Sequence, residues 1–286
     1  IFIKMTNYRH EAGIETIDQK LDPLKLALNY ESAKSSIVEL LPSQGLIIKT
    51  KERTLSSTIY EAFSTIFFSE LLKEYNRLLQ GDFTLYSPQS THFGYGNKGD
   101  NKSRTSVLTQ FFCPGNALNK VDRSRRKDYQ IKDDEVRVEN RTMYLTGIMS
   151  EILKREGIIH GDPQLRHFFL LPNEVLLTYH KEGQCGHVPS KNGLGVIDVE
   201  GTRVLDSEAE DVKRDQDLFK TRVFRKFDVV PESSRYFELG TNFVNQECGD
   251  LRVAGHVYQL ARNLFSKRFS NCVEEVDMKN KKIKFK

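Results

Sequence analysis

Short apolar runs separated by polar turns occupy the first part of the chain. They lie at residues 26–30, 37–41 and 45–50, and Pro42 to Gly45 form a turn-like stretch before the third run. Apolar runs of this length, bounded by turn residues, are typical of strands joined by tight connections. The pattern therefore predicts a three-stranded antiparallel meander.

Longer segments with a helical repeat follow. Apolar residues recur at three- and four-residue steps from Ser57 to Leu79 and again from Thr142 to Glu156, where Gly157 predicts the helix end. A strand is expected at Val107 to Phe112 and a last helix at Asp250 to Phe269. The basic tail from Met278 is expected to be frayed. The sequence thus predicts an α+β fold.

Two stretches bring an acidic residue to the end of an apolar run. Ile158–Ile159 lead into His160-Gly161-Asp162, and Val196–Ile197 lead into Asp198, with Glu200 two residues later. An unpaired acid is costly inside a core, so two carboxylates at strand ends indicate a site rather than packing.

These stretches resemble the catalytic motifs of protein-kinase-like phosphotransferases. The family pattern is His-Arg-Asp or His-Gly-Asp, four residues and then Asn. Here His160-Gly161-Asp162 is followed at the same spacing by His167, and Asp198 takes the place of the metal-binding Asp. The His-Gly-Asp form is similar to the atypical branch, which includes lipopolysaccharide kinases, aminoglycoside phosphotransferases, and Rio and Bud32 kinases.

The resemblance implies roles for individual residues. Asp162 would accept the proton of the acceptor hydroxyl, and Asp198 would hold Mg²⁺ or Mn²⁺ on ATP. His167 stands in the second metal-ligand position, where the family has Asn, and Glu200 could add a carboxylate ligand. Lys49, at the end of the third apolar run, would hold the α- and β-phosphates.

Further nucleotide contacts follow from the same resemblance. Glu74 is the expected partner of Lys49, with Glu61 and Glu70 as alternatives on the same helix. The stretch Thr109 to Leu118 is similar to the hinge that binds adenine. The expected phosphate-loop residues are Ser32, Ala33, Lys34 and Ser35, which replace the usual glycines, and the expected hinge contacts are Gln110 and Phe112.

The implied architecture is a bilobal protein-kinase-like fold. The N-terminal lobe would span residues 1–112 and hold the nucleotide-binding sheet and the long helix, and residues 113–286 would form the C-terminal lobe. Thr178 to Gly193 would be an inserted hairpin between paired strands. The stretch Asp211 to Leu218 resembles the helix that supports the active site in lipopolysaccharide and Bud32-type kinases.

Composition narrows the possible classes of protein only slightly. The 286 residues are 38% hydrophobic and 29% charged, with a net charge of +4, which fits a globular protein and does not by itself indicate nucleic acid. The four cysteines form no Cys-x-x-Cys pair, which favours reduced thiols and a cytoplasmic protein. No apolar run approaches the length of a membrane helix.

The function expected from the resemblance is ATP-dependent phosphorylation of a hydroxyl on a sugar, a small molecule or a protein. One alternative is a pseudokinase that retains the fold as a nucleotide- or partner-binding scaffold. Another is a Rio- or Bud32-like role beside RNA or a ribonucleoprotein, using the basic cluster Arg123 to Lys127.

Overall fold

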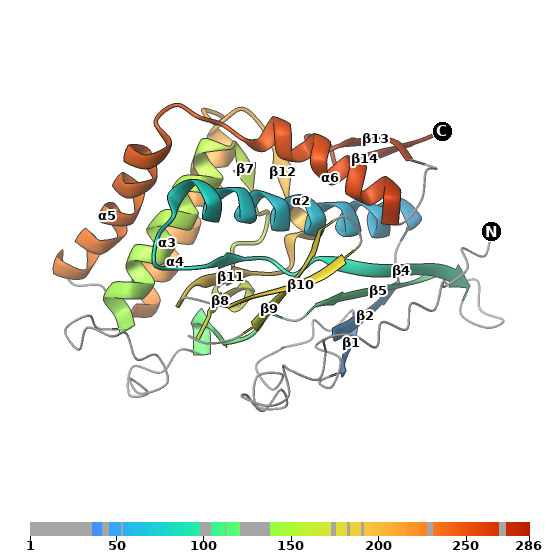
Figure 1. Ribbon diagram of the computed structural model, residues 1–286, viewed down its shortest axis with the longest axis horizontal. Helices are drawn as coiled ribbons and strands as arrows, with labels where there is room; N and C mark the ends of the chain where they lie inside the picture. The colour runs from blue at the N-terminus through green and yellow to red at the C-terminus, as the bar shows by residue number, and fades with distance from the viewer. Residues whose placement is uncertain are drawn as a thin grey trace.

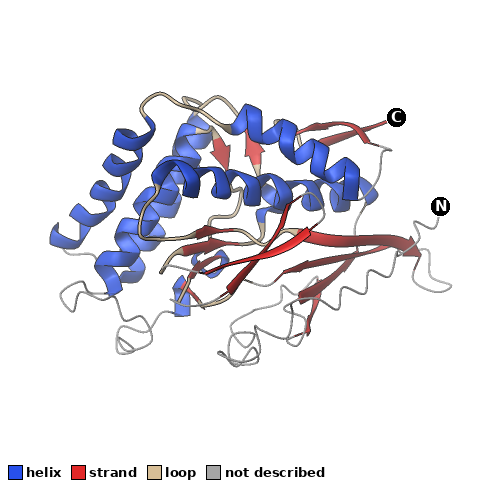
Figure 2. Cartoon of the chain, in the orientation of Figure 1, coloured by secondary structure: helices blue, strands red, loops and turns tan. Residues whose placement is uncertain are grey.

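The arrangement of the chain was analysed in a computed structural model. The structure describes residues 36–41, 46–52, 54–97, 104–111, 113–120, 138–172, 176–181, 184–189, 192–227, 231–268 and 273–286. Helices and small sheets alternate along the chain, and Figure 2 shows most of the helices on one side of the molecule and the longer strands on the other. The expected α+β class is confirmed.

A four-stranded antiparallel sheet forms from the first apolar runs. Its strands are β1 (Ser36–Leu41), β2 (Leu46–Glu52), β4 (Ser90–Asn97) and β5 (Arg104–Phe111), in the order β1-β2-β5-β4. The runs expected at 37–41, 45–50 and 107–112 therefore coincide with β1, β2 and β5, except for residues 45 and 112, which lie outside the described residues. The first expected strand, at 26–30, lies outside the described residues.

The long helix α2 (Leu55–Leu79) lies against this sheet and crosses the middle of the molecule (Figure 1). The Thr54 side chain caps it by accepting from the backbone N–H of Ser57 at 3.2 Å. Most of its residues are buried, including Phe63, Phe67 and Tyr75. A helix that is apolar on nearly all sides belongs inside a core, and α2 is the centre of the main hydrophobic cluster.

A second sheet lies beside α2 and contains only short strands. Its order is β3 (Leu85–Tyr86), β11 (Leu194–Val196), β8 (Phe168–Leu170) and β6 (Asn116–Ala117). The expected pairing of the strand after the first acidic motif with the strand that leads into Asp198 is confirmed by β8 and β11, which run antiparallel. Between them, β9 (Leu176–Lys181) and β10 (Gln184–Pro189) form the expected inserted hairpin.

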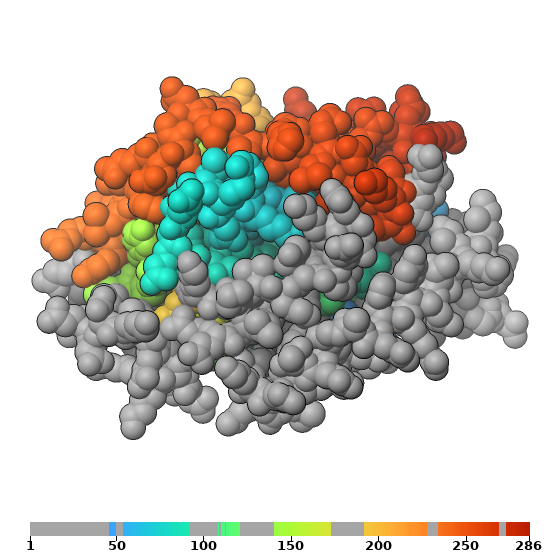
Figure 3. All heavy atoms as spheres, in the orientation of Figure 1, coloured from blue at the N-terminus to red at the C-terminus, as the bar shows by residue number. Residues whose placement is uncertain are grey.

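Four further helices complete the described fold. They are α3 (Val138–Arg155), α4 (Glu210–Phe227), α5 (Pro231–Cys248) and α6 (Ala254–Arg268). Helix α3 packs between α4 and α5, and α6 runs along α2 (Figure 1). Figure 3 shows α5 and α6, in orange and red, along the upper edge of this face. In the described part of the chain, no helix is long and apolar enough to cross a membrane.

The expectation of a frayed tail is wrong. Strands β13 (Val273–Asp277) and β14 (Lys282–Phe285) form an antiparallel hairpin beside α6 (Figure 1). Val273, Val276 and Met278 are buried in the main core, and the Tyr258 hydroxyl donates to the Val276 carbonyl oxygen at 2.8 Å. The lysines dominate the composition of this segment, but its alternate apolar side chains anchor it.

Candidate functional site

Lys49 lies at the centre of a buried charge cluster. The register of β2 on β5 places Lys49 opposite Leu108, on the face that meets α2. The Lys49 side chain is 6% exposed, and its Nζ lies 2.6 Å from Asp198 Oδ1 and 3.6 Å from Glu61 Oε1. Burial lowers the pKa of Lys49, but the carboxylates of Asp198 and Glu61 outweigh it and raise the pKa above its ordinary value. The ammonium group is therefore charged.

Glu61, and not the expected Glu74, is the helix acid that faces Lys49. Glu61 is 1% exposed, whereas Glu74 lies three turns further along α2 and pairs with Arg77 on the helix surface. The prediction of Glu74 is therefore wrong. The sequence contained a signal for Glu61, because this acid is enclosed by Ile59, Tyr60, Ala62 and Phe63, whereas Glu74 stands among Lys73, Asn76 and Arg77.

The loop that carries Asp162 is held beside the loop that carries Asp198. Strand β7 (Ile158–Ile159) pairs with β12 (Arg203–Val204), so the two acidic motifs approach each other at one end of this pair. Gly161 has φ +86, and a Cβ on it would lie 2.6 Å from the carbonyl oxygen of Gly201. Only glycine allows both this backbone conformation and this close approach.

His160 and Asp215 hold the Asp162 loop in place through hydrogen bonds. Asp215, on α4, accepts from the backbone N–H groups of His160 and Gly161 at 3.0 and 3.4 Å. His160 is fully buried, and burial together with neighbouring His167 lowers its pKa to about 4. The neutral ring donates from Nε2 to the carbonyl oxygen of Ile197 at 3.1 Å, which links the two loops. The stretch Asp211 to Leu218 resembles a helix that supports the active site, and Asp215 within it contacts the Asp162 loop directly.

His167 bridges Asp162 and Asp198. Its Nδ1 lies 2.9 Å from the carbonyl oxygen of Asp162, which only accepts, so the ring proton is on Nδ1. The lone pair on Nε2 accepts from Arg166 Nε at 3.1 Å, and Nε2 is 3.3 Å from Asp198 Oδ2. Two of the three expected metal ligands, His167 and Asp198, therefore lie side by side.

A divalent cation could bind between these two atoms only by taking the His167 Nε2 lone pair from Arg166 Nε, which lies 3.1 Å away. Ligands at about 2.1 Å from one ion lie roughly 3 Å apart when they occupy adjacent positions. The separation of 3.3 Å between His167 Nε2 and Asp198 Oδ2 is close to that value. No group of three or more metal-ligating side chains occurs among the described residues. A cation here would therefore complete its shell with phosphate and water oxygens, which is how Mg²⁺ is usually bound.

The other expected site residues lie nearby or outside the described residues. Glu200, in the short helical turn Val199–Gly201, adds a negative charge that raises the Lys49 pKa. Gln110 is 2% exposed on β5, opposite Ile47, and its Nε2 has no hydrogen-bond partner among the described residues. Ser32, Ala33, Lys34, Ser35 and Phe112 lie outside the described residues.

One residue beside Asp162 has no counterpart in the motifs. Arg222 of α4 places Nη1 3.9 Å from Asp162 Oδ1, although sixty residues separate the two in sequence. It follows Asp215 by seven positions, or two helical turns, so both side chains leave α4 toward the Asp162 loop. Only this helical spacing from Asp215 could have indicated Arg222 in advance.

The two candidate partners of Lys49 can be distinguished by substitution. We expect Glu61→Gln to weaken ATP binding about tenfold, because Lys49 loses a buried charged partner and is held less firmly. Glu74→Gln is the matched control and should leave the affinity unchanged, since Glu74 pairs with Arg77 on the helix surface. Calorimetric titration with ATP and Mg²⁺ measures both, and a larger loss for Glu74→Gln would contradict the assignment.

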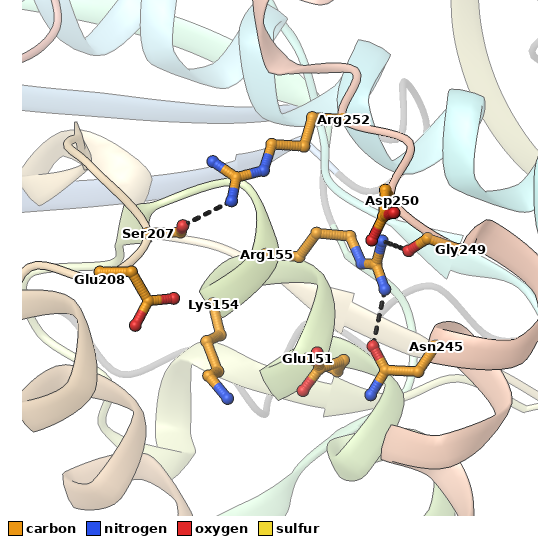
Figure 4. A pocket seen from close by; sticks show the side chains of 9 residues that line it. All are labelled: Glu151, Lys154, Arg155, Ser207, Glu208, Asn245, Gly249, Asp250 and Arg252. Carbon is orange, nitrogen blue, oxygen red and sulfur yellow. Dashed lines mark hydrogen bonds between the residues drawn. The ribbon is translucent and has the colours of Figure 1, made fainter.

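A separate polar cavity of about 590 Å³ lies where the end of α3 meets the α5–α6 junction (Figure 4). Arg155 donates to the carbonyl oxygen of Gly249 and, at 2.6 Å, to Asn245 Oδ1. Arg252 donates to Ser207 Oγ at 2.8 Å. These arginines hold segments of the protein together, and the cavity shares no residue with the cluster around Lys49, Asp162 and Asp198.

Comparison with protein-family models finds no match, and comparison with curated protein sequences finds none. Among solved structures, the chain is similar to WaaP in complex with acyl carrier protein, with 12% identity, a TM-score of 0.42, and coverage of 90% of this chain and 96% of that one. It is also similar to Rio2 kinase in an ADP/Mg²⁺–phosphoaspartate complex from Chaetomium thermophilum, with 11% identity, a TM-score of 0.37, and coverage of 83% and 70%.

Proposed function

We propose that this chain is an ATP-dependent phosphotransferase with a bilobal kinase-like fold, which transfers the γ-phosphate to a hydroxyl of a sugar, a small molecule or a protein. The observation that carries the proposal is the convergence of Lys49, Asp198 and Asp162. Lys49 forms an ion pair with Asp198, and His167 lies between the carboxylates of Asp198 and Asp162, at 3.3 and 3.9 Å. Phosphoryl transfer needs mainly positioning and charge neutralisation, and these groups supply both.

Each residue has a distinct part in the proposed reaction. Lys49, held by Glu61, binds the α- and β-phosphates, and His167 and Asp198 hold Mg²⁺ or Mn²⁺. The metal, when bound, neutralises phosphate charge. Asp162 orients the acceptor hydroxyl and accepts its proton as the acceptor oxygen bonds to the γ-phosphorus. The bond from that phosphorus to the β-phosphate oxygen breaks, and ADP leaves.

A catalytically weak nucleotide-binding scaffold is the second candidate. The contact that favours it is the ion pair of 2.6 Å between Lys49 Nζ and Asp198 Oδ1, because nucleotide and metal must compete for both partners. Replacement of the family Asn by His167 also favours it, since imidazole prefers softer ions than Mg²⁺. The basic cluster of the RNA-linked alternative, residues 123–127, lies outside the described residues.

The test is ATP binding and ADP release measured in one titration with Mg²⁺ or Mn²⁺. We expect turnover with at least one metal, and a loss of roughly 10²- to 10³-fold in Asp198→Ala, because this carboxylate lies beside both Lys49 and His167. Asp217→Ala, an exposed position on α4, is the control. Binding without turnover would favour the scaffold, and no binding with either metal would reject both candidates.

A further inference from the structure

Arg222 lies beside Asp162, and its positive charge also acts on Asp215 of the same helix. Its Nη1 is buried from solvent and has no hydrogen-bond partner in the part of the chain that the structure describes. The distance of 3.9 Å to Asp162 Oδ1 allows attraction between the charges but is too long for a hydrogen bond. The Arg222 side chain as a whole is 34% exposed.

The other arginines near this loop are used differently. Arg166 donates from Nε to His167 at 3.1 Å, and Arg203 donates from Nη2 to Asp211 at 3.4 Å. A guanidinium group that served only to fix a carboxylate would form the short, bidentate hydrogen-bonded ion pair that arginine and carboxylate favour. Arg222 does not form this contact with Asp162, although the two groups are adjacent.

Asp162 itself is already held by its own loop. Gln164 Nε2 donates to Asp162 Oδ2 at 3.0 Å, and the Asp162 side chain is 45% exposed. Its Oδ1 faces Arg222, so an entering acceptor meets a carboxylate and a guanidinium group side by side. The Asp162 carboxylate can accept a hydrogen bond from a hydroxyl. The planar guanidinium group of Arg222 can donate two parallel hydrogen bonds to a phosphate or a carboxylate.

We infer that the acceptor carries an anionic group, a phosphate or a carboxylate, close to the hydroxyl that is phosphorylated, and that Arg222 binds this group. The inference rests on the proposed function and narrows its acceptor class. The proximity of Arg222 Nη1 to Asp162 Oδ1 limits the anionic group to a position a few bonds from the reacting hydroxyl.

The experiment compares acceptors that differ only in charge. Transfer of labelled γ-phosphate from ATP is measured to glycerol, glycerol 3-phosphate and glycerate. We expect transfer to at least one charged acceptor to exceed transfer to glycerol by about 10- to 100-fold in kcat/KM, mainly through a lower KM. The phosphate and carboxylate arms show which anion is preferred.

Arg222 variants test whether this preference comes from the guanidinium group. In Arg222→Gln the ratio of charged to neutral acceptor should fall to near one, and Arg222→Lys should retain part of it, because lysine keeps the charge without the fork. Arg225→Gln removes the same charge from an exposed position on α4 and should keep the wild-type ratio. Thermal unfolding of each variant establishes that it is folded, and the ratio is independent of the amount of active protein.

Several results would overturn the inference while leaving the proposed function intact. They are ATP hydrolysis without transfer to either charged acceptor, equal transfer to charged and neutral acceptors, and an unchanged ratio in both Arg222 variants. A wild-type chain that neither binds nor hydrolyses ATP would overturn the proposed function and this inference with it.

Discussion

Asp162→Asn should lower phosphoryl transfer by roughly 10²- to 10⁴-fold while ATP binding stays within a few fold of the wild-type value. The amide has the shape of the carboxylate and can still accept from Gln164, whose Nε2 lies 3.0 Å from Asp162 Oδ2. It cannot take the proton of the acceptor hydroxyl. The loss should therefore appear in turnover, measured as ADP release and labelled product, and not in the calorimetric affinity for ATP.

Asp217→Asn makes the same chemical change on an exposed part of α4 and serves as the control. Full turnover in Asp162→Asn would remove Asp162 from the proposed reaction. A parallel loss of ATP affinity and turnover would instead assign Asp162 a role in binding nucleotide. Turnover and calorimetry together therefore separate an effect on kcat from an effect on the affinity for ATP.

Glu156→Ala should destabilise the fold by about 3 to 4 kcal/mol, which is large for a single substitution. Glu156 is 4% exposed at the end of α3 and accepts from the Tyr75 hydroxyl at 2.5 Å, from Val253 N at 2.9 Å and from Ala254 N at 2.8 Å. It therefore joins α2, α3 and the start of α6. Alanine would leave two buried donors, Tyr75 and Val253, and the part-buried Ala254 N–H without their acceptor.

Urea or thermal unfolding measures this effect, and the expected decrease in melting temperature is roughly 10 °C. Glu247→Ala, an exposed position on α5, should change the free energy of unfolding by no more than about 0.5 kcal/mol. Tyr75→Phe removes one of the three donors and should cost less than Glu156→Ala. A loss below 1 kcal/mol for Glu156→Ala would contradict the role of this carboxylate as the link between the three helices.

Local patterns were sufficient for much of the fold and for part of the site. The apolar repeat from Ser57 to Leu79 predicts α2 to within two residues, because apolar side chains at three- and four-residue steps form one continuous face of a helix. Lys49, Asp162, His167 and Asp198 were chosen from short motifs, and the structure brings them together. Strand β4, which includes the sequence STHFGYGN, was not predicted because glycine and polar residues hide its strand character.

Residue pairing across the fold was not accessible from local patterns. Glu61 and Glu74 both lie on one helix, and only the packing of α2 against β2 and β5 decides which acid faces Lys49. The C-terminal hairpin is likewise held by contacts of Val276 and Tyr258 that its lysine-rich sequence does not indicate.

Periodicity and short motifs are enough to predict the fold class, the long helix and the residues Lys49, Asp162, His167 and Asp198, because these features are local in the chain. The tertiary structure alone decided that Glu61 pairs with Lys49 and that Arg222 lies beside Asp162. Such contacts depend on how helices and strands pack, and side chains 12 or 60 positions apart become neighbours only when burial of the core fixes that packing.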